Sequence, residues 1–370
     1  MKFTCEQQTL VKALNTVSKA VTSRTTIPIL KGILLNVKNG KLILSASDLE
    51  ISIEKSIEVN VIEEGSTVVM ARLFSDIVRK LPNEEISISQ EINGKILIKS
   101  AFSEFNIVGL NSDEFPSIGN ITEEETDKLV FDKDIFKDMI RKSSFAASAD
   151  DSKGVIVGVL MECKDNHLNM IALDGFRMAV IREKMIIDKE QNIIVSAKLL
   201  NEISKIISEE EAQKDIEMIL DNKKALIKID STKVILRLLE GQFIKYRDIL
   251  PKEKKCIIKI NRSNLQNSIE RASLLAKEGK NNLIKMTILG NLLTITSKSE
   301  EGDVKEEIIM EKTGEDIVIG FNSKYISDVL KVVDEEELLM EFNTPTSPCL
   351  IKQIEGNRFE YLVLPVRITA

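Results

Sequence analysis

The most constraining feature of the sequence is a pattern that returns every 126 residues. Arg72, Lys198 and Lys324 keep this interval, and each begins a segment with helical apolar spacing that is followed by a strand-like run. The three segments read MARLFSDIVRK, SAKLLNEISK and NSKYISDVLK. A second set of strand-to-helix segments begins at residues 2, 129 and 257. Because an internal repeat determines architecture more firmly than local propensity does, we predict one unit written three times.

Each unit is expected to hold two halves, and each half a strand, a helix and further strands. Residues 32–37, 41–47, 49–59 and 66–71 are strand-like, and Asn39-Gly40 and Asn93-Gly94 are hairpin turn signals. Alternating residues over 96–109 indicate an antiparallel sheet with one buried face, against which the two helices of a unit pack. The pattern predicts an α+β fold rather than a doubly wound parallel sheet.

The periodicity lapses in two short charged segments that contain proline, at residues 113–128 and 246–255. These lapses predict three domains, at residues 1–122, 128–250 and 255–370. A chain of 370 residues with 43% hydrophobic content is large enough for three cores of this size.

Composition limits the possible functions. The start of the chain has no apolar leader, and no run of about 18 apolar residues occurs, so we expect a cytoplasmic protein without a membrane segment. Four well-separated cysteines and the single histidine, His167, give little support to zinc binding or to His-based catalysis. We therefore predict no catalytic residues, no metal and no cofactor.

The charge distribution points to an anionic partner. The chain carries −7 overall, which disfavours nonspecific nucleic-acid binding by the protein as a whole. The six expected helices nevertheless carry about +9 in total, at residues 6–23, 72–81, 133–146, 198–208, 262–277 and 324–333. Lysine and glutamate would mix on faces that serve only solubility, so this segregation favours a shared helical surface that faces phosphate. Helix propensity, which favours Lys, Arg and Glu alike, is the competing explanation.

Four segments resemble those of a known family. They are RTTIPILKGILL at 24–35, LDGFRMAV at 173–180, EGQFIKYRDILPK at 240–252 and YLVLPVR at 361–367. Together they make the chain similar, from Met1 to Arg367, to the β subunits of bacterial DNA polymerase III, the sliding clamps.

The resemblance implies three clamp domains per subunit, with antiparallel sheets outside and helices inside, in a head-to-tail homodimer that closes around double-stranded DNA. Such a ring is a non-catalytic processivity subunit of a DNA-directed DNA polymerase. The implied partners are the replicative polymerase catalytic subunit, the clamp loader complex and other clamp-binding replication and repair proteins. Arg24 and Arg72 match DNA-contacting positions, internal symmetry adds Lys198 and Lys324, and the basic helix at 133–146 adds Arg141.

The family also implies a groove that accepts short linear peptides. Its matching positions here are Ile156, Leu173, Gly175, Phe176, Arg177, Met178, Ile244, Arg247, Ile249, Leu362, Val363, Leu364, Pro365, Val366 and Arg367. Phe176 stands where histidine is common and Ile244 where proline is common, so a more apolar groove is expected. Ring closure by edge-strand pairing is expected at Phe105 and Ile107 against Leu274 and Leu275.

Two other functions fit parts of the sequence. An enzyme would use Asp174, Arg177 and Lys198, but no Walker A or dinucleotide-binding motif is present and no nucleophile has a histidine partner. A repeat scaffold that binds peptides but not DNA would direct its basic helices at acidic partners.

Overall fold

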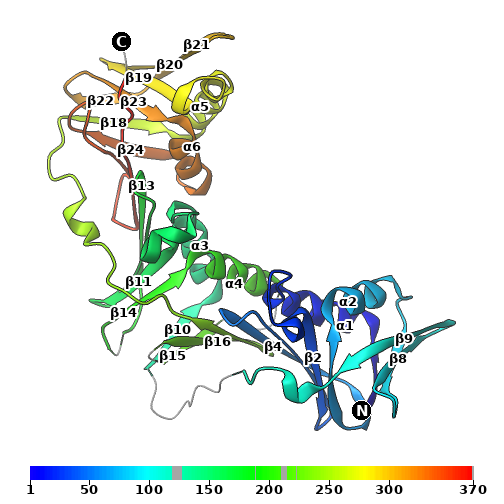
Figure 1. Ribbon diagram of the computed structural model, residues 1–370. Coiled ribbons are helices and arrows are strands. Elements are labelled where there is room, and N and C mark those ends of the chain that lie inside the picture. Colours follow the sequence, from blue (N-terminus) through cyan, green and yellow to red (C-terminus); the bar gives the residue numbers. More distant parts are fainter. Residues whose placement is uncertain (119–126, 188, 210–214, 222, 369–370) are drawn as a thin grey trace. The chain divides into compact units, whose positions relative to one another are not determined.

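The computed structural model describes residues 1–118, 127–187, 189–209, 215–221 and 223–368 (Figure 1). The domain limits expected at residues 122 and 370 lie outside these ranges. The chain separates into two compact units. The first comprises Met1–Ile135 with Glu202–Leu238, and the second comprises Phe136–Asn201 with Leu239–Ala370.

The first unit is built on one antiparallel sheet. In spatial order its described strands are β10 (Asp127–Asp132), β15 (Asp215–Asp221), β16 (Lys224–Ile229), β17 (Thr232–Arg237), β4 (Ile51–Glu58), β3 (Lys41–Ser47), β2 (Gly32–Lys38), β6 (Gly65–Met70), β9 (Ser103–Leu110), β8 (Lys95–Ser100), β7 (Glu85–Gln90), β1 (Lys2–Glu6) and β5 (Asn60–Glu63). Helices α1 (Gln7–Val17) and α2 (Ala71–Lys80) lie side by side, and α1 packs on β3 and β4 (Figure 1). Leu10, Leu14 and Phe74 are fully buried, so the apolar stripes of both helices form the core against the sheet.

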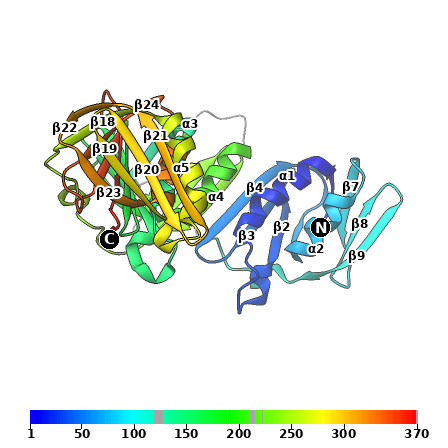
Figure 2. The same cartoon turned by 90° about the horizontal axis from the view of Figure 1, so that it is seen from above.

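The described residues of the second unit form two antiparallel sheets. The larger runs β14 (Gln191–Ser196), β11 (Gly158–Lys164), β12 (His167–Leu173), β13 (Arg177–Lys184), β26 (Phe359–Val363), β25 (Cys349–Lys352), β24 (Glu337–Phe342), β18 (Cys256–Asn261) and β22 (Glu311–Gly314). The smaller runs β21 (Gly302–Ile309), β20 (Leu292–Ser299), β19 (Leu283–Leu289) and β23 (Ile317–Asn322), with β20 and β21 adjacent in Figure 2. Helix α5 (Arg262–Ala276) packs on α6 (Ser323–Val332) and on β20 and β21.

The two remaining helices, α3 (Lys133–Ser143) and α4 (Ala197–Glu209), each begin in one unit and end in the other. The boundaries of the two units do not coincide with those of the three sequence repeats, because the sheets continue from one repeat into the next. Strand β17 of the second repeat pairs with β4 of the first, and β26 of the third pairs with β13 of the second. The prediction of an α+β fold with antiparallel sheets and two helices per repeat is confirmed for the described residues.

The turns show which local signals were sufficient. Asn39 and Gly40 adopt positive φ angles of 53° and 76° between β2 and β3, as their sequence predicts. The alternating run at 96–109, however, is divided into β8 and β9 by a two-residue turn, Ala101-Phe102, in which Ala101 has a φ of 48°. Alternation continues through this turn, and neither residue is a usual turn former, so no local pattern indicates the division.

Candidate functional site

Three basic residues occupy one equivalent position in the structure. Arg72, Lys198 and Lys324 are the second residues of α2, α4 and α6, and all three side chains are exposed. None of these helices has an acidic residue in its first turn. A cation near a helix N-terminus is unfavourable because the helix dipole is positive there. Within the described residues none of the three forms an ion pair, so their charges remain available to an external anion.

The two other basic residues expected at a DNA surface behave differently from each other. Arg24 is exposed, and its backbone N–H donates to Thr22 Oγ1 at 3.2 Å. Arg141 instead donates to Asp138 Oδ1 at 2.5 Å, to Asp334 Oδ2 at 2.7 Å and to the Val332 carbonyl at 3.0 Å. Burial lowers the pKa of Arg141, but the hydrogen bonds to these two carboxylates raise it more. The Arg141 guanidinium is therefore committed to a structural network.

Lys142 belongs to the same network. Only 2% of its side chain is exposed, and its Nζ lies 2.8 Å from both Asp138 Oδ2 and Asp334 Oδ2. Burial raises the pKa of Asp334, but hydrogen bonds from Lys142 and Arg141 outweigh it and the pKa is lowered. These contacts attach the end of α3 to the segment that follows α6.

A second group of predicted site residues meets in an apolar cluster of the second unit, which we call the Leu362 cluster. Its buried members are Leu160, Ile171, Leu173, Met178, Val180, Ile194, Tyr246 and Leu362, and its half-buried members are Val155, Ile156, Leu239, Phe243, Leu250 and Leu364. Ile156, Leu173, Met178, Leu362 and Leu364 were all predicted to line a peptide groove, and the fold brings them together. Half-buried apolar side chains at its margin suit the capture of an apolar peptide side chain.

Other predicted groove residues lie around this cluster or away from it. Phe176, Ile244 and Ile249 expose large parts of their side chains. Val363 is fully buried, and because side chains alternate along β26 it faces the opposite side from Leu362. The terminal residues Pro365 and Val366 are half-buried and Arg367 is exposed.

Arg177, the first residue of β13, anchors the turn that contains Gly175. Its guanidinium donates to Asp174 Oδ2 at 3.1 Å, to Asp328 Oδ2 at 2.6 Å and to the Phe145 carbonyl at 2.9 Å. It also lies over the Tyr325 ring, 4.9 Å from the centroid. Gly175 has a φ of 95°, which a residue with a side chain rarely adopts.

Phe176 stacks on Tyr325 with ring centroids 5.9 Å apart and an interplanar angle of 15°. The Tyr325 ring on which Phe176 stacks also lies against the Arg177 guanidinium. An exposed aromatic residue at this place therefore has a fixed orientation, which lowers the entropy lost when a ligand packs on it.

Arg247 is held by a buried carboxylate. Glu162 accepts from Arg247 Nη1 at 2.9 Å and Nη2 at 2.6 Å, from the Tyr246 hydroxyl at 2.9 Å and from Asn169 Nδ2 at 3.1 Å. Burial raises the pKa of Glu162, but the hydrogen bonds from Arg247 and Tyr246 outweigh it and the pKa is lowered. The network fixes the 3-10 turn Tyr246–Asp248, and with it Ile244 and Ile249, against β11 and β12.

Sequence reasoning missed Tyr325, Asp328, Glu162 and Tyr246. A signal existed for Tyr325, because the equivalent positions of the repeat hold Leu73 and Leu199. A departure from an apolar consensus within a repeat indicates a local task. The acidic partners carried no such signal, since they meet Arg177 and Arg247 only in the folded chain.

The residues expected at ring closure are only partly buried. Phe105 on β9 is 39% exposed and Leu274 near the end of α5 is 65% exposed, whereas Ile107 is nearly buried and Leu275 is half-buried. Of the three residues in the enzyme hypothesis, Asp174 and Arg177 pair with each other, and neither has a described contact with Lys198.

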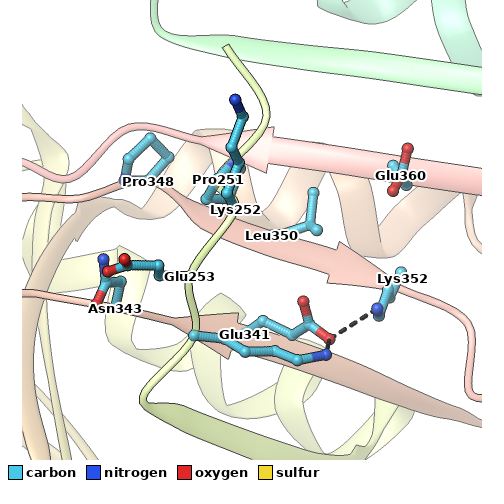
Figure 3. Close-up of a pocket in the computed structure, with 10 residues that line it drawn as sticks. Pro251, Lys252, Glu253, Glu341, Asn343, Pro348, Leu350, Lys352 and Glu360 are labelled. Carbon is cyan, nitrogen blue, oxygen red and sulfur yellow. Dashed lines mark hydrogen bonds and ion pairs between the residues drawn. The ribbon is translucent and has the colours of Figure 1, made fainter. Parts of the chain in front are cut away.

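The second unit also contains a polar pocket of about 190 Å³, shown in Figure 3. Its walls come from Pro251, Lys252, Glu253, Lys254, Glu341, Asn343, Pro348, Leu350, Lys352 and Glu360. Lys254 and Lys352 both bind Glu341 Oε1, at 2.9 Å and 2.7 Å, so the buried carboxylate is neutralised within the protein. Burial raises the pKa of Glu341, but these two hydrogen bonds outweigh it and the pKa is lowered.

No helix in the described ranges is both long and apolar enough to cross a membrane. All four cysteines are buried free thiols, and burial raises the pKa of the Cys5 thiol to about 12.

Comparison with known proteins places these features in one family. Residues 1–119, 130–245 and 247–367 match the N-terminal, central and C-terminal domains described for the DNA polymerase III beta subunit. The chain is 35% identical over 378 aligned positions to the beta sliding clamp of Staphylococcus epidermidis, covering 99% of both.

Solved structures agree with this match. One from Eubacterium rectale, described as a putative DNA polymerase III beta subunit, is 35% identical with a TM-score of 0.94. The DNA polymerase sliding clamp of Bacillus subtilis is 33% identical with a TM-score of 0.95, and both comparisons cover 100% of each chain. The chain therefore belongs to the family of DNA polymerase III beta subunits, the beta sliding clamps.

Proposed function

We propose that this chain acts as a DNA sliding clamp. Two subunits form a closed ring around duplex DNA and tether the replicative polymerase and other replication and repair proteins to it. The ring makes and breaks no covalent bond, and processivity comes from topological linkage rather than from sequence recognition. The bacterial cytoplasm is the proposed location.

The observation that carries the proposal is the exposed basic residue at the second position of α2, α4 and α6. Arg72, Lys198 and Lys324 repeat with the fold, have no acid in the first helical turn and form no ion pair among the described residues. Helix N-termini favour anions, so each cation lies where a phosphate is bound most easily. Contacts of this kind read the DNA backbone and permit sliding. Arg24 is proposed to join them, and Arg141 is proposed to act only through the fold.

Ring closure is proposed at two free strand edges. Strand β21 ends its sheet among the described strands, and β9 pairs with β6 only at Gly109 and Leu110. Head-to-tail pairing of β9 with β21 of a second copy covers both edges. Phe105 and Ile107 on β9 then meet Leu274 and Leu275 on α5 of that copy.

Partner capture is proposed at the Leu362 cluster. Its half-buried margin, with Phe176 and Ile244 beside it, suits the apolar side chains of a short linear peptide. Arg177 and Arg247 keep the walls of this site in place. The polymerase catalytic subunit, the clamp loader complex and other clamp-binding proteins are the proposed donors of such peptides.

The first experiment combines sedimentation mass with retention on DNA circles, after loading by the cognate loader and ATP. We expect a mass of twice 41.5 kDa, retention on nicked circles and loss from linearised DNA. A monomer, or equal retention on both DNAs, contradicts topological binding.

A repeat scaffold that binds peptides but not DNA is the second candidate, favoured by the Leu362 cluster alone. Replacing Arg24 and Arg72 by glutamate separates the two. Unchanged salt-dependent retention on closed circles after this double substitution contradicts the DNA role of these two residues. A wild-type chain that is not retained on closed circles favours the scaffold. The domain limits 1–122, 128–250 and 255–370 are proposed with this function.

A further inference from the structure

The third repeat exposes an apolar stripe at positions that are polar in the other two. Two-residue turns join β2 to β3, β11 to β12 and β19 to β20, so the residues beside these turns correspond without gaps. Three positions are compared: the residue before the turn, the residue after it, and the residue of the following strand that pairs with the latter. They hold Lys38, Lys41 and Glu58 in repeat 1, Lys164, His167 and Lys184 in repeat 2, and Leu289, Leu292 and Ile309 in repeat 3. The last three, here called the repeat-3 stripe, are 54%, 37% and 86% exposed.

The two junctions between repeats use one register. Ile53 on β4 lies opposite Val234, and Ala179 on β13 lies opposite Tyr361. Ile53 and Ala179 are equivalent. Ile53 pairs with Ala46 and Ala179 pairs with Ala172, and each alanine lies six residues after the corresponding two-residue turn of its repeat.

The same backbone hydrogen bond closes each junction. The Ser56 N–H donates to the Ser231 carbonyl at 3.0 Å, and the Arg182 N–H donates to the Arg358 carbonyl at 2.7 Å. The two donors lie three positions after Ile53 and Ala179, and the two acceptors lie three positions before Val234 and Tyr361. The register is therefore a property of the repeat rather than of one junction.

This register can be transferred to the two free edges. The residue equivalent to Ile53 is Val304 on β21, because its hairpin partner Ser297 also stands six residues after the turn. The residue equivalent to Val234 is Phe105 on β9, because β8–β9 and β16–β17 have the same two-residue turn. The first residues of these turns, Ala101 and Asp230, have φ angles of 48° and 52°.

With Val304 opposite Phe105, Lys305 lies opposite Glu104. The equivalent pair in the first junction, Glu54 and Lys233, also joins opposite charges. Opposite charges across a strand pair stabilise it, so the transferred register is electrostatically favourable.

The register also places Phe102 beside the repeat-3 stripe. Phe102 is the equivalent of Ser231, so the transferred register directs its carbonyl at the Glu307 N–H. Ile309 lies two residues beyond Glu307 on β21 and therefore on the same sheet face as Glu307 and Phe102. A diagonal neighbour of this kind is within reach of an aromatic side chain. The Phe102 side chain is fully exposed in the single subunit.

We infer that Phe102 of each subunit packs on the repeat-3 stripe of a second copy of this chain, on the opposite sheet face from Phe105. The inference rests on the proposed ring closure and adds a second contact to it. The first junction supports this choice of occupant. There the residue equivalent to Phe102 is the polar Ser231, and the position equivalent to Ile309 holds the charged Glu58. An apolar residue therefore occurs at one of these positions where the other is also apolar.

The test measures the dimer dissociation constant by sedimentation for the full chain and for two single variants. F102S is expected to weaken the dimer about tenfold or more, because the phenylalanine side chain loses its apolar burial. Ile92→Ser is the matched control, since Ile92 is equally exposed on the neighbouring β7–β8 turn but lies outside the register. Circular dichroism confirms that both variants stay folded.

Charge reversal tests the register separately. Lys305→Glu should weaken the dimer by placing two acids opposite each other, and adding Glu104→Lys should restore it. A dimer that is unaffected by F102S, or weakened equally by Ile92→Ser, overturns the contact while leaving ring closure intact. A wild-type chain that stays monomeric overturns the ring itself.

Discussion

The basic residues of this chain fall into two groups that composition cannot separate. Arg72, Lys198 and Lys324 are exposed and form no ion pair among the described residues, whereas Arg141 and Arg177 are each bound by two carboxylates. The first group recurs at the same position in every repeat. The second group has no basic equivalent in the other repeats, and each member pairs with one acid three residues away and with one distant acid of the third repeat. Recurrence therefore marks the residues that serve the shared function, and pairing marks those that stabilise one site.

The largest effect is expected when a bound arginine is removed. Arg177→Ala leaves Asp174 and Asp328 without their partner in a mostly buried site, so the free energy of unfolding should fall by roughly 3–5 kcal/mol. Denaturant unfolding monitored by circular dichroism measures it. Arg367→Ala, at an exposed terminal position, is the control and should unfold like the wild type. An unaltered midpoint for the Arg177 variant means that the pair is not structural.

Removing the free group should change DNA binding but not stability. A triple change of Arg72, Lys198 and Lys324 to glutamine removes six cations from a ring of two subunits. It should reduce the slope of log affinity against log salt by about 5.4, which is about 1,800-fold less change between 50 and 200 mM salt. Thermal stability should stay the same or rise slightly, because cations leave three helix N-termini.

The matched control replaces three exposed lysines on strands, Lys38, Lys164 and Lys285, by glutamine. Both triple variants lose the same charge. An equal loss of salt dependence in the two would show that net charge matters and helix position does not.

The carboxylate that holds Arg247 should have a smaller effect, and it should depend on pH. The pKa of Glu162 is lowered from 4.5 in the folded state, so its stabilisation is fully present above pH 4.5 and is lost as pH falls through the folded-state pKa. Glu162→Gln should lower the free energy of unfolding by about 1–2 kcal/mol at neutral pH. Unfolding curves from pH 7 down to the acid range should show a weaker pH dependence in the variant, and parallel curves would contradict this account.

The smallest effect is expected for Arg141→Gln. Its side chain is partly exposed, so the loss of its ion pairs should lower the free energy of unfolding by about 0.5–1 kcal/mol. The salt dependence of DNA binding should match the wild type, in contrast to Arg72→Gln. A loss of salt dependence equal to that of Arg72→Gln would move Arg141 into the free group.

Local signals in the sequence were enough for much of this fold. The 126-residue spacing indicated three repeats, and Asn39-Gly40 predicted a hairpin that the structure contains. The same spacing identified the recurring cations in the first helical turns. Five predicted groove residues also meet in one cluster. The alternating run 96–109 was misleading, because a turn at Ala101-Phe102 preserves the alternation while reversing the chain.

Spacing along the chain encodes the number of repeats, the class of fold and the position of each free cation along its helix. Tertiary structure alone decided which basic residues are occupied, because Asp334 lies 193 residues from Arg141 and Asp328 lies 151 residues from Arg177. It also decided that Val363 faces the core while Leu362 faces the cluster. Periodicity is a short-range property, whereas ion pairs and strand neighbours depend on where the sheets bring distant segments together.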